Sequence, residues 1–270
     1  DAHAEMTPHP VSCQDLLRCL EPWRAAKFVH SEMPIRYAER IRWIERIKDW
    51  RRIPQLVQVY WIHLETFQAF RSVDRHPTLD AFTEVVQKAV EDQREVVRLM
   101  ATSMHRLQEI AGDDYAPGFI DEFLDGFLLN RFGSNVLMSQ YLALLKPTER
   151  TTGIIDTRCD AAEVCRQAAG EVLRITHDYT GRRPLIRVEA RSAHGSDEGV
   201  PRFSYIPSAL RYIMAELLKN SCRATVDVVQ TDQELDARPI NIVVCADDRR
   251  VAICTSDQAG GIPFDIGSHV

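Results

Sequence analysis

Apolar residues recur at steps of three and four through the first half of the chain, and this spacing limits what it can form. From Pro54 to Phe70 the positions are Leu56, Val59, Tyr60, His63, Phe67 and Phe70. From Leu79 to Ile110 they are Phe82, Val85, Val86, Ala89, Val96, Leu99, Met100 and Leu107. Because a period near 3.6 residues places such side chains on one face, each segment is predicted to be an amphipathic helix.

Helical signals continue from Ser12 to about Leu145, with a third long helix predicted from Pro117 to Leu145. Its inward residues are expected to be Leu128, Leu137, Leu142 and Leu145. Breaks are expected at Met33–Pro34, Ile53–Pro54, His76–Thr78 and Gly112–Gly118. Long helices joined by short connections pack as bundles, so this half is predicted to be a helical domain.

The pattern changes after Lys146 and Pro147, where strands and helices begin to mix. The predicted elements are a helix over Cys159–Tyr179, a strand over Leu185–Ala190, a short segment at Arg202–Ile206, a second helix, and a hairpin with strands at Asn241–Cys245 and Val251–Cys254. The fold class is therefore predicted to be α+β, with one domain over residues 1–150 and another over 151–270.

Composition restricts the function classes. With 270 residues and 45% hydrophobic content, the chain can bury a substantial core. Its net charge of −6 comes from 33 basic and 39 acidic residues that are well mixed, which does not favour a nucleic-acid partner. Its apolar runs are shorter than the roughly 18 residues that a membrane span needs.

Seven cysteines are present, an odd number without a C-x-x-C motif. They are Cys13, Cys19, Cys159, Cys165, Cys222, Cys245 and Cys254. The last three lie within apolar segments. This pattern predicts free thiols in a reducing compartment rather than a disulfide framework.

The second helix of the mixed half carries an unusual polar stripe. Glu216, Asn220 and Arg223 stand at i, i+4 and i+7, so they share one helical face. About thirty residues later an apolar strand delivers Asp257 into a glycine turn. A polar helix face alone indicates solvation, and Asp before glycine alone indicates an ordinary turn. Their combination predicts a nucleotide site.

Several segments along nearly the whole chain carry a family resemblance. They are Lys27–Ala38, Phe123–Asp125, Ile155–Cys159, Phe203–Ser208, Met214–Thr225 and Ser256–Pro263. In this order they resemble motifs of the mitochondrial protein kinases, which comprise the pyruvate dehydrogenase kinases and their branched-chain 2-oxoacid dehydrogenase kinase relative. Met214–Thr225 looks like the N-box of that family, and Ser256–Pro263 resembles its first glycine box.

The resemblance implies a four-helix-bundle regulatory domain followed by an ATP-binding α/β sandwich of the type shared with histidine kinases, DNA gyrase and Hsp90. It implies a protein-serine kinase of the mitochondrial matrix that phosphorylates, and so inactivates, the decarboxylase component of a 2-oxoacid dehydrogenase complex. Pyruvate and branched-chain complexes both remain possible targets, with pyruvate dehydrogenase favoured. Docking on lipoyl domains of the acyltransferase core and a homodimer are also implied.

The family motifs assign roles to three residues, with ATP and Mg²⁺ as the implied cofactors. Asn220 matches the asparagine that ligates Mg²⁺ between the phosphates, and an amide oxygen is a suitable hard ligand. Glu216 matches the carboxylate that accepts the proton of the substrate serine. Asp257 matches the aspartate that accepts a hydrogen bond from the adenine amino group.

Four further residues are expected near the nucleotide. Gly261 and Ile262 belong to the glycine box. Lys219 and Arg223 could offset phosphate charge, although such cations more often pair with acids on the same helix, here Glu216 or Asp227.

The chain departs from the family pattern in three places. Ala259 replaces the first glycine of the box, where a methyl group could crowd the nucleotide or require an unfavourable φ. Tyr141 stands where the family usually has a histidine that contacts the catalytic glutamate; its hydroxyl could still donate to Glu216. The sequence ends at Val270, before a second glycine-rich loop. These 270 residues alone are therefore expected to bind nucleotide weakly or not at all.

Two other functions are considered. A catalytically weak or inactive relative could act as a regulatory subunit on the lipoyl core or on a sister kinase, which Ala259 and Tyr141 would favour. A histidine kinase would need a phosphoacceptor histidine on its helices. His63 and His105 lie on predicted helices but lack the expected acidic setting, so they are predicted to be ordinary core or surface residues.

Overall fold

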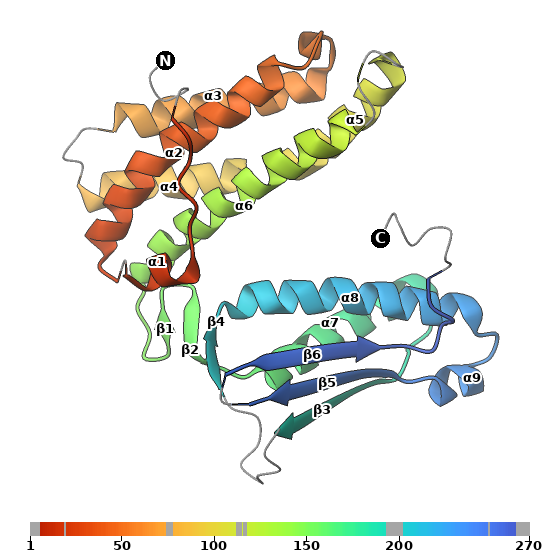
Figure 1. Cartoon of the computed structure of the whole chain (residues 1–270). Coiled ribbons are helices and arrows are strands. Elements are labelled where there is room, and N and C mark those ends of the chain that lie inside the picture. Colours follow the sequence, from red (N-terminus) through yellow and green to blue (C-terminus); the bar gives the residue numbers. More distant parts are fainter. Residues whose placement is uncertain are drawn as a thin grey trace. The chain divides into compact units, whose positions relative to one another are not determined.

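The computed structural model of the chain describes residues 6–18, 20–73, 78–111, 115, 118–192, 202–247 and 249–262. The chain divides into two compact units, Asp1–Ile154 and Ile155–Val270, each described by itself below. Figure 1 shows a first unit built mainly of helices and a second in which helices accompany small sheets, in agreement with the predicted α+β class. Predicted features at the following positions lie outside the described residues: Cys19, His76, Gly112, Pro117 and Pro263.

Long helices make up the first unit. Its elements are α1 (Cys13–Arg18), α2 (Pro22–Glu45), a 3₁₀ turn η2 (Trp50–Arg52), α3 (Pro54–Ser72), α4 (Leu79–Asp92), α5 (Val96–Ala111), α6 (Phe119–Leu144) and the short strand β1 (Thr151–Thr152). Helix α2 packs against α3 and α6, α3 against α5, and α4 against α6. No helix in the described parts of the chain is both long and apolar enough to cross a membrane.

The break predicted at Met33–Pro34 is wrong, because Pro34 lies inside α2. Proline lacks an N–H and normally costs a helix interior about 3 kcal/mol. Here Met33, Pro34 and Ile35 are all buried in the packed unit. Tertiary burial of this turn therefore outweighs the local preference.

The single helix predicted over Leu79–Ile110 is also wrong, since α4 ends at Asp92 and α5 begins at Val96. Gln93 lies at the break and is only 2% exposed. Its backbone carbonyl accepts a hydrogen bond from Arg131 Nη2 at 3.0 Å, and its Oε1 accepts one from Arg40 Nη1 at 3.2 Å. Hydrogen bonds from other helices thus hold the residue that interrupts the periodic segment.

Arg40 is the central polar residue of the helical unit, and its side chain is completely buried. Besides the bond to Gln93, its Nη2 donates to Ser134 Oγ at 3.1 Å. Its guanidinium carbon lies 4.0 Å from the centre of the Tyr37 ring. No ion pair with a carboxylate is found for it within the described ranges, and burial lowers its pKa. Neutral dipoles and an aromatic face therefore hold this cation.

The second unit contains two small sheets and their covering helices. Its elements are β2 (Ile155–Cys159), α7 (Ala161–Thr180), β3 (Ile186–Ser192), β4 (Phe203–Tyr205), α8 (Pro207–Val228), α9 (Asp232–Ala237), β5 (Ile240–Ala246) and β6 (Val251–Ser256). One sheet has the order β3-β5-β6, with β3 parallel and β6 antiparallel to the central β5. The other sheet has the order β1-β2-β4, with β2 antiparallel to β4.

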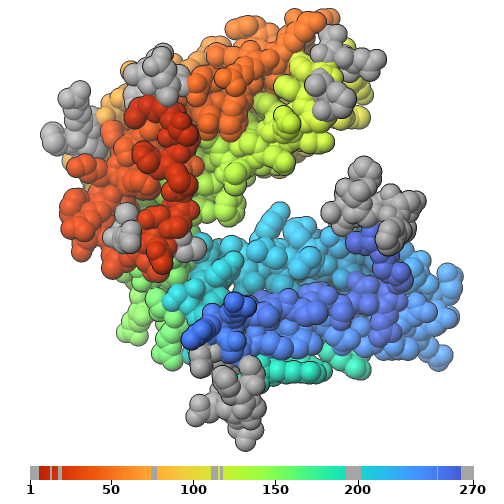
Figure 2. Space-filling view, in the orientation of Figure 1, coloured from red at the N-terminus to blue at the C-terminus, as the bar shows by residue number. Residues whose placement is uncertain are grey.

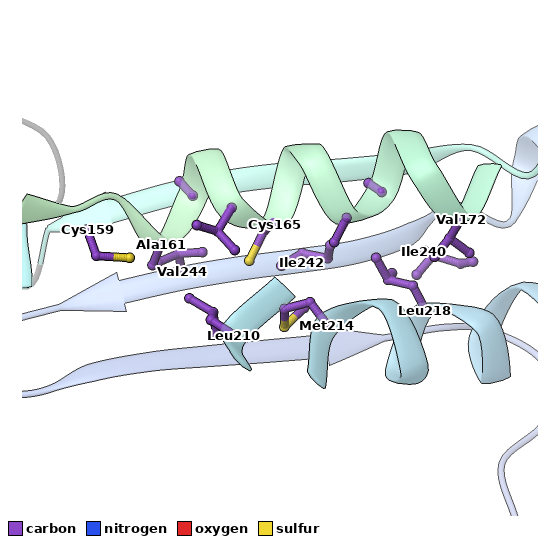
Figure 3. Packing of buried hydrophobic residues seen from close by; sticks show 14 of the residues in the cluster. Cys159, Ala161, Cys165, Val172, Leu210, Met214, Leu218, Ile240, Ile242 and Val244 are labelled. Atoms are coloured by element: carbon purple, nitrogen blue, oxygen red, sulfur yellow. The ribbon is translucent and has the colours of Figure 1, made fainter. Parts of the chain in front are cut away.

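The core of this unit lies between the β3-β5-β6 sheet and helices α7 and α8. Figure 3 shows Leu210, Met214 and Leu218 of α8 facing alternate residues of β5. Those residues are Ile240, Ile242 and Val244, each completely buried. Because side chains alternate along a strand, the intervening positions Asn241, Val243 and Cys245 point to the other face.

Helix α7 has well-defined ends. Asp160 caps its start, accepting a hydrogen bond from the Glu163 N–H at 3.0 Å, and Gly181 ends it with a left-handed φ of 70°. An aspartate N-cap is worth about 1 kcal/mol, and glycine adopts this φ without the steric cost of a Cβ.

The prediction of free thiols is confirmed for the cysteines whose side chains are described: Cys159, Cys165, Cys222, Cys245 and Cys254. The first three are buried, whereas Cys245 and Cys254 are exposed on the outer face of the sheet. Burial raises the pKa of Cys165 to about 11, and it also raises the pKa of Cys222.

We predict that iodoacetamide at pH 8 modifies Cys245 and Cys254 of the native protein before Cys165 and Cys222. The thiolate is the reactive species, and burial disfavours it and blocks access. Peptide mass spectrometry after timed labelling measures the order, and unfolding in urea serves as the control that should abolish it. Equal native labelling of Cys165 and Cys254 would contradict the packing of this core.

We also predict that the helical unit loses stability below about pH 6.5, partly through His63. Burial, and then the charge of Arg40, hold the pKa of His63 well below its usual range. The unfolded chain therefore binds a proton that the folded chain does not, and the free energy of unfolding falls by up to about 1.4 kcal/mol per pH unit.

Urea unfolding between pH 7.5 and 5.5, compared between wild type and His63→Gln, isolates this contribution. The variant should show the shallower fall with decreasing pH, whatever its absolute stability. Parallel pH profiles would mean that His63 is not enclosed as described.

Candidate active site

Helix α8 presents two chemically different faces. Its buried positions are Leu210, Met214, Leu218, Ser221, Cys222 and Thr225. Its other face carries the predicted polar stripe, with Asn220 and Arg223 exposed and Glu216 and Lys219 partly exposed. The spacing of the apolar residues thus turns the polar residues outward.

Glu216 is paired with Lys219 one turn along the helix. Lys219 Nζ donates to Glu216 Oε1 at 2.6 Å, with the two side chains 41% and 45% exposed, respectively. Arg223 Nε lies 3.9 Å from Asp227 Oδ2, and both of these side chains are highly exposed. The pairing expected of cations on this helix is therefore present. Exposed pairs of this kind contribute less than about 1 kcal/mol.

Asn220 is available to bind a ligand. Its side chain is exposed, and no hydrogen-bond partner for it is found in the part of the chain that the structure describes. An unengaged amide oxygen fits the requirement of Mg²⁺ for oxygen ligands. No group of three or more histidine, cysteine, aspartate or glutamate side chains able to hold a metal occurs among the described residues.

Asp257 begins the turn that follows β6. Its Oδ1 accepts a hydrogen bond from the Ala259 N–H at 3.1 Å, which forms an Asx turn. Gly260 and Gly261 follow with φ values of 98° and 80°. No atom lies within 4 Å of a Cβ built on either glycine, so their backbone conformation rather than crowding requires glycine. The exposed Ile262 completes the described part of the predicted glycine box.

The sequence suggested that Ala259 could need an unfavourable φ, and the structure shows that it does not. Among the described non-glycine residues only Asp49 has a positive φ. Ala259 therefore adopts an ordinary backbone conformation, and the two glycines after it make the tight part of the turn.

The strand register places Asp257 at the end of the sheet where β3 and β5 begin. Ser256, just before it, pairs with Asn241 near the start of β5. At this end Figure 3 shows Leu218 beside Ile240. Because Glu216 and Asn220 flank Leu218 on α8, the polar stripe and the glycine turn occupy the same end of the unit.

Tyr141 is enclosed within the helical unit. It is completely buried, and its hydroxyl lies 2.6 Å from Thr83 Oγ1 and 3.3 Å from the Leu79 carbonyl oxygen. The hydroxyl group of Tyr141 is therefore engaged within the helical unit. His63 is likewise a core residue, as predicted, and its burial removes it as a phosphoacceptor.

Comparison with known proteins identifies the family. Residues 10–157, more than half of the chain, match the family described as mitochondrial branched-chain alpha-ketoacid dehydrogenase kinase. The chain belongs to this family of mitochondrial kinases. The resemblance inferred from the sequence is thus confirmed, and its helical part alone suffices to show it.

Relatives of the mitochondrial kinase family extend the match into the second unit. A mitochondrial [pyruvate dehydrogenase (acetyl-transferring)] kinase of Arabidopsis thaliana is 30% identical over 88% of this chain and 64% of its own length. One from Drosophila melanogaster is 26% identical over 87% of the chain and 60% of its length. Isozyme 3 from Homo sapiens is 27% identical over 98% of the chain and 68% of its length.

The human match covers almost the whole chain, so it includes α8 and the turn at Asp257. The chain nevertheless spans only 64% and 60% of the first two kinases.

Two polar groups of α2 were not singled out from the sequence. One is the buried Arg40. The other is the pair Arg36 and Glu39, and these two residues line a cavity of the helical unit. The available signal was a set of charged residues, three or four positions apart, within the apolar face of one long helix.

We predict that the polar stripe of α8 is dispensable for folding. Asn220→Ala and Glu216→Gln should each change the free energy of unfolding by less than about 0.5 kcal/mol, because they alter exposed groups. Leu218→Ala, the matched change on the buried face, should cost about 2–5 kcal/mol. Urea unfolding measures all three, and a large loss in Asn220→Ala would show a structural rather than a functional role.

Proposed function

We propose that this protein is a protein-serine kinase that acts on the decarboxylase component of a mitochondrial 2-oxoacid dehydrogenase complex. The supporting observation is the placement of Glu216, Asn220 and Asp257 at one end of the second unit, in a chain whose relatives are named pyruvate dehydrogenase kinases. The relatives' names favour pyruvate dehydrogenase as the target, and they favour the mitochondrial matrix as the location.

The two parts of the chain take different tasks in this proposal. Residues 1–150 form a four-helix-bundle regulatory domain that docks on lipoyl domains of the acyltransferase core. Residues 151–270 form an ATP-binding domain of the histidine-kinase, gyrase and Hsp90 type, and the protein acts as a homodimer. The covering of one sheet face by α7 and α8 is compatible with such a sandwich.

The residues of the site would divide the work of phosphoryl transfer. Asp257 accepts a hydrogen bond from the adenine amino group, Gly261 and Ile262 lie beside the nucleotide, and Asn220 supplies an amide oxygen to Mg²⁺. When bound, Mg²⁺ neutralises charge on the phosphate oxygens.

Glu216 acts as the general base in this proposal. The serine hydroxyl oxygen bonds to the γ-phosphorus, the bond from that phosphorus to the bridging oxygen of ADP breaks, and the serine proton passes to the Glu216 carboxylate. Lys219 occupies Glu216 in the structure. Lys219 could turn from Glu216, or Arg223 from Asp227, toward the phosphates. The free-energy cost would be small, because both ion pairs are exposed.

We predict that protein extended at its C-terminus to the length of its relatives incorporates labelled phosphate from ATP into the purified decarboxylase subunit. Glu216→Gln should lower the rate by about a hundredfold or more, the usual contribution of a general base, and Asn220→Ala should abolish Mg²⁺-dependent transfer. Asp178→Asn, at an exposed acid of α7, is the matched control and should retain activity.

The same assay separates the alternatives. Pyruvate and branched-chain decarboxylase subunits tested side by side identify the target, and an acid-stable product identifies phosphoserine rather than phosphohistidine. No transfer to either subunit, together with retained binding to a lipoyl domain, would contradict the kinase proposal and support a regulatory subunit. The 270-residue chain alone should bind ATP weakly or not at all in a calorimetric titration, since it spans only 64% and 60% of the length of the first two kinase relatives.

A further inference from the structure

The helical unit contains a cavity remote in sequence from the α8 stripe. It has a volume of about 610 Å³ and is formed by the N-terminal segment from Thr7 to Val11 together with α2 and α6. Figure 1 shows this segment, in red, running along the helices of the unit. Small-molecule sites in proteins typically have volumes of roughly 300–1,000 Å³ and combine apolar walls with a few placed polar groups.

Arg36 supplies a fixed donor at the wall of this cavity. Its side chain is only 7% exposed; Nε donates to Glu32 Oε2 at 3.3 Å, and Nη2 donates to the His9 carbonyl oxygen at 2.6 Å. Nη1 has no hydrogen-bond partner among the described residues, and a Cβ built on Gly133 would lie 2.7 Å from it. A pinned guanidinium therefore presents an unused edge beside Gly133, which also lines the cavity.

Glu39 supplies the complementary acceptor one helical turn away. Its Oε2 accepts a hydrogen bond from Asn130 Nδ2 at 2.6 Å, while no partner for its Oε1 is found in the described ranges. Arg36 and Glu39 form no ion pair with each other, although both line the cavity. A cation and an anion on one helical face are thus kept apart, each with a free hydrogen-bonding position.

The remaining wall is apolar and open to solvent. Phe132 is 59% exposed and Leu129 73% exposed, and both border the cavity together with Trp43 and Val136. Figure 2 shows this N-terminal segment, in dark red, on the surface of the helical unit. Such large exposed apolar side chains beside buried polar groups indicate a surface that binds a ligand.

We propose that this cavity binds a free α-amino acid with a large apolar side chain. The ligand carboxylate meets Arg36 Nη1, its ammonium group meets Glu39 Oε1, and its side chain lies against Phe132, Leu129 and Trp43. A dianionic phosphate is disfavoured because Glu32 already bonds the single guanidinium and Glu39 adds a second carboxylate to the cavity wall. A simple carboxylic acid would leave Glu39 without a partner.

The test uses L-phenylalanine and L-leucine as probes, with binding followed by ligand-observed NMR on the intact 270-residue chain. Both amino acids should bind. Removing the ammonium group, as in 3-phenylpropanoic acid, or the carboxylate, as in 2-phenylethylamine, should weaken binding about tenfold or more, the effect of losing one charged hydrogen bond. Equal binding of 3-phenylpropanoic acid, or no binding of either amino acid, would overturn the proposal.

Variants locate the site without removing the structural bonds of Arg36. Glu39→Gln keeps an oxygen that can accept the hydrogen bond from Asn130. It should lower the affinity for L-phenylalanine about tenfold and leave the affinity for 3-phenylpropanoic acid unchanged. Phe132→Ala should lower the affinity for both amino acids. Leu128→Ala is the control and should not lower it, because Leu128 is a 40% exposed residue of α6 that does not line the cavity. Wild-type affinity in both Glu39→Gln and Phe132→Ala would show that the ligand binds elsewhere.

Discussion

The division of α8 into a buried and a solvent-facing side is the constraint on which the second unit depends. Leu210, Met214 and Leu218 hold the helix on β5 and so fix which way the intervening residues point. Full burial of each such side chain is worth roughly 1.5–3 kcal/mol. Glu216 and Asn220 are therefore oriented by their apolar neighbours, and their own contacts add little to stability.

The helical unit differs from the second unit in that the charged side chain of Arg40 lies inside its core. Arg40 is completely buried and bonded to Gln93 and Ser134, which come from different parts of the chain. Removing one partner would leave a buried charge undersatisfied, which is far more costly than losing an exposed pair. This network also explains why the break between α4 and α5 falls at Gln93, because Gln93 accepts hydrogen bonds from both Arg40 and Arg131.

Periodicity predicted most helices and the hairpin strands, because these elements bury one face. It failed where tertiary contacts overrule local preference: Pro34 stays within α2, and Gln93 divides a segment with continuous apolar spacing. It also placed Leu128 inward, whereas that side chain is 40% exposed. The α8 stripe and Asp257 were found from sequence because both are local motifs. The Arg36 and Glu39 cavity was not, since it needs residues from three separated segments.

The strength of the contacts around each polar group separates structural from functional roles. Arg40 is enclosed by partners that no ligand can replace without opening the core. Glu216 and Lys219 are held by one exposed bond, and Asn220 has no partner among the described residues. Breaking an exposed pair of this kind costs less than about 1 kcal/mol, so these side chains can exchange partners while α8 stays packed. The same reasoning applies to Arg36, whose two fixed bonds leave one edge of a rigid guanidinium available.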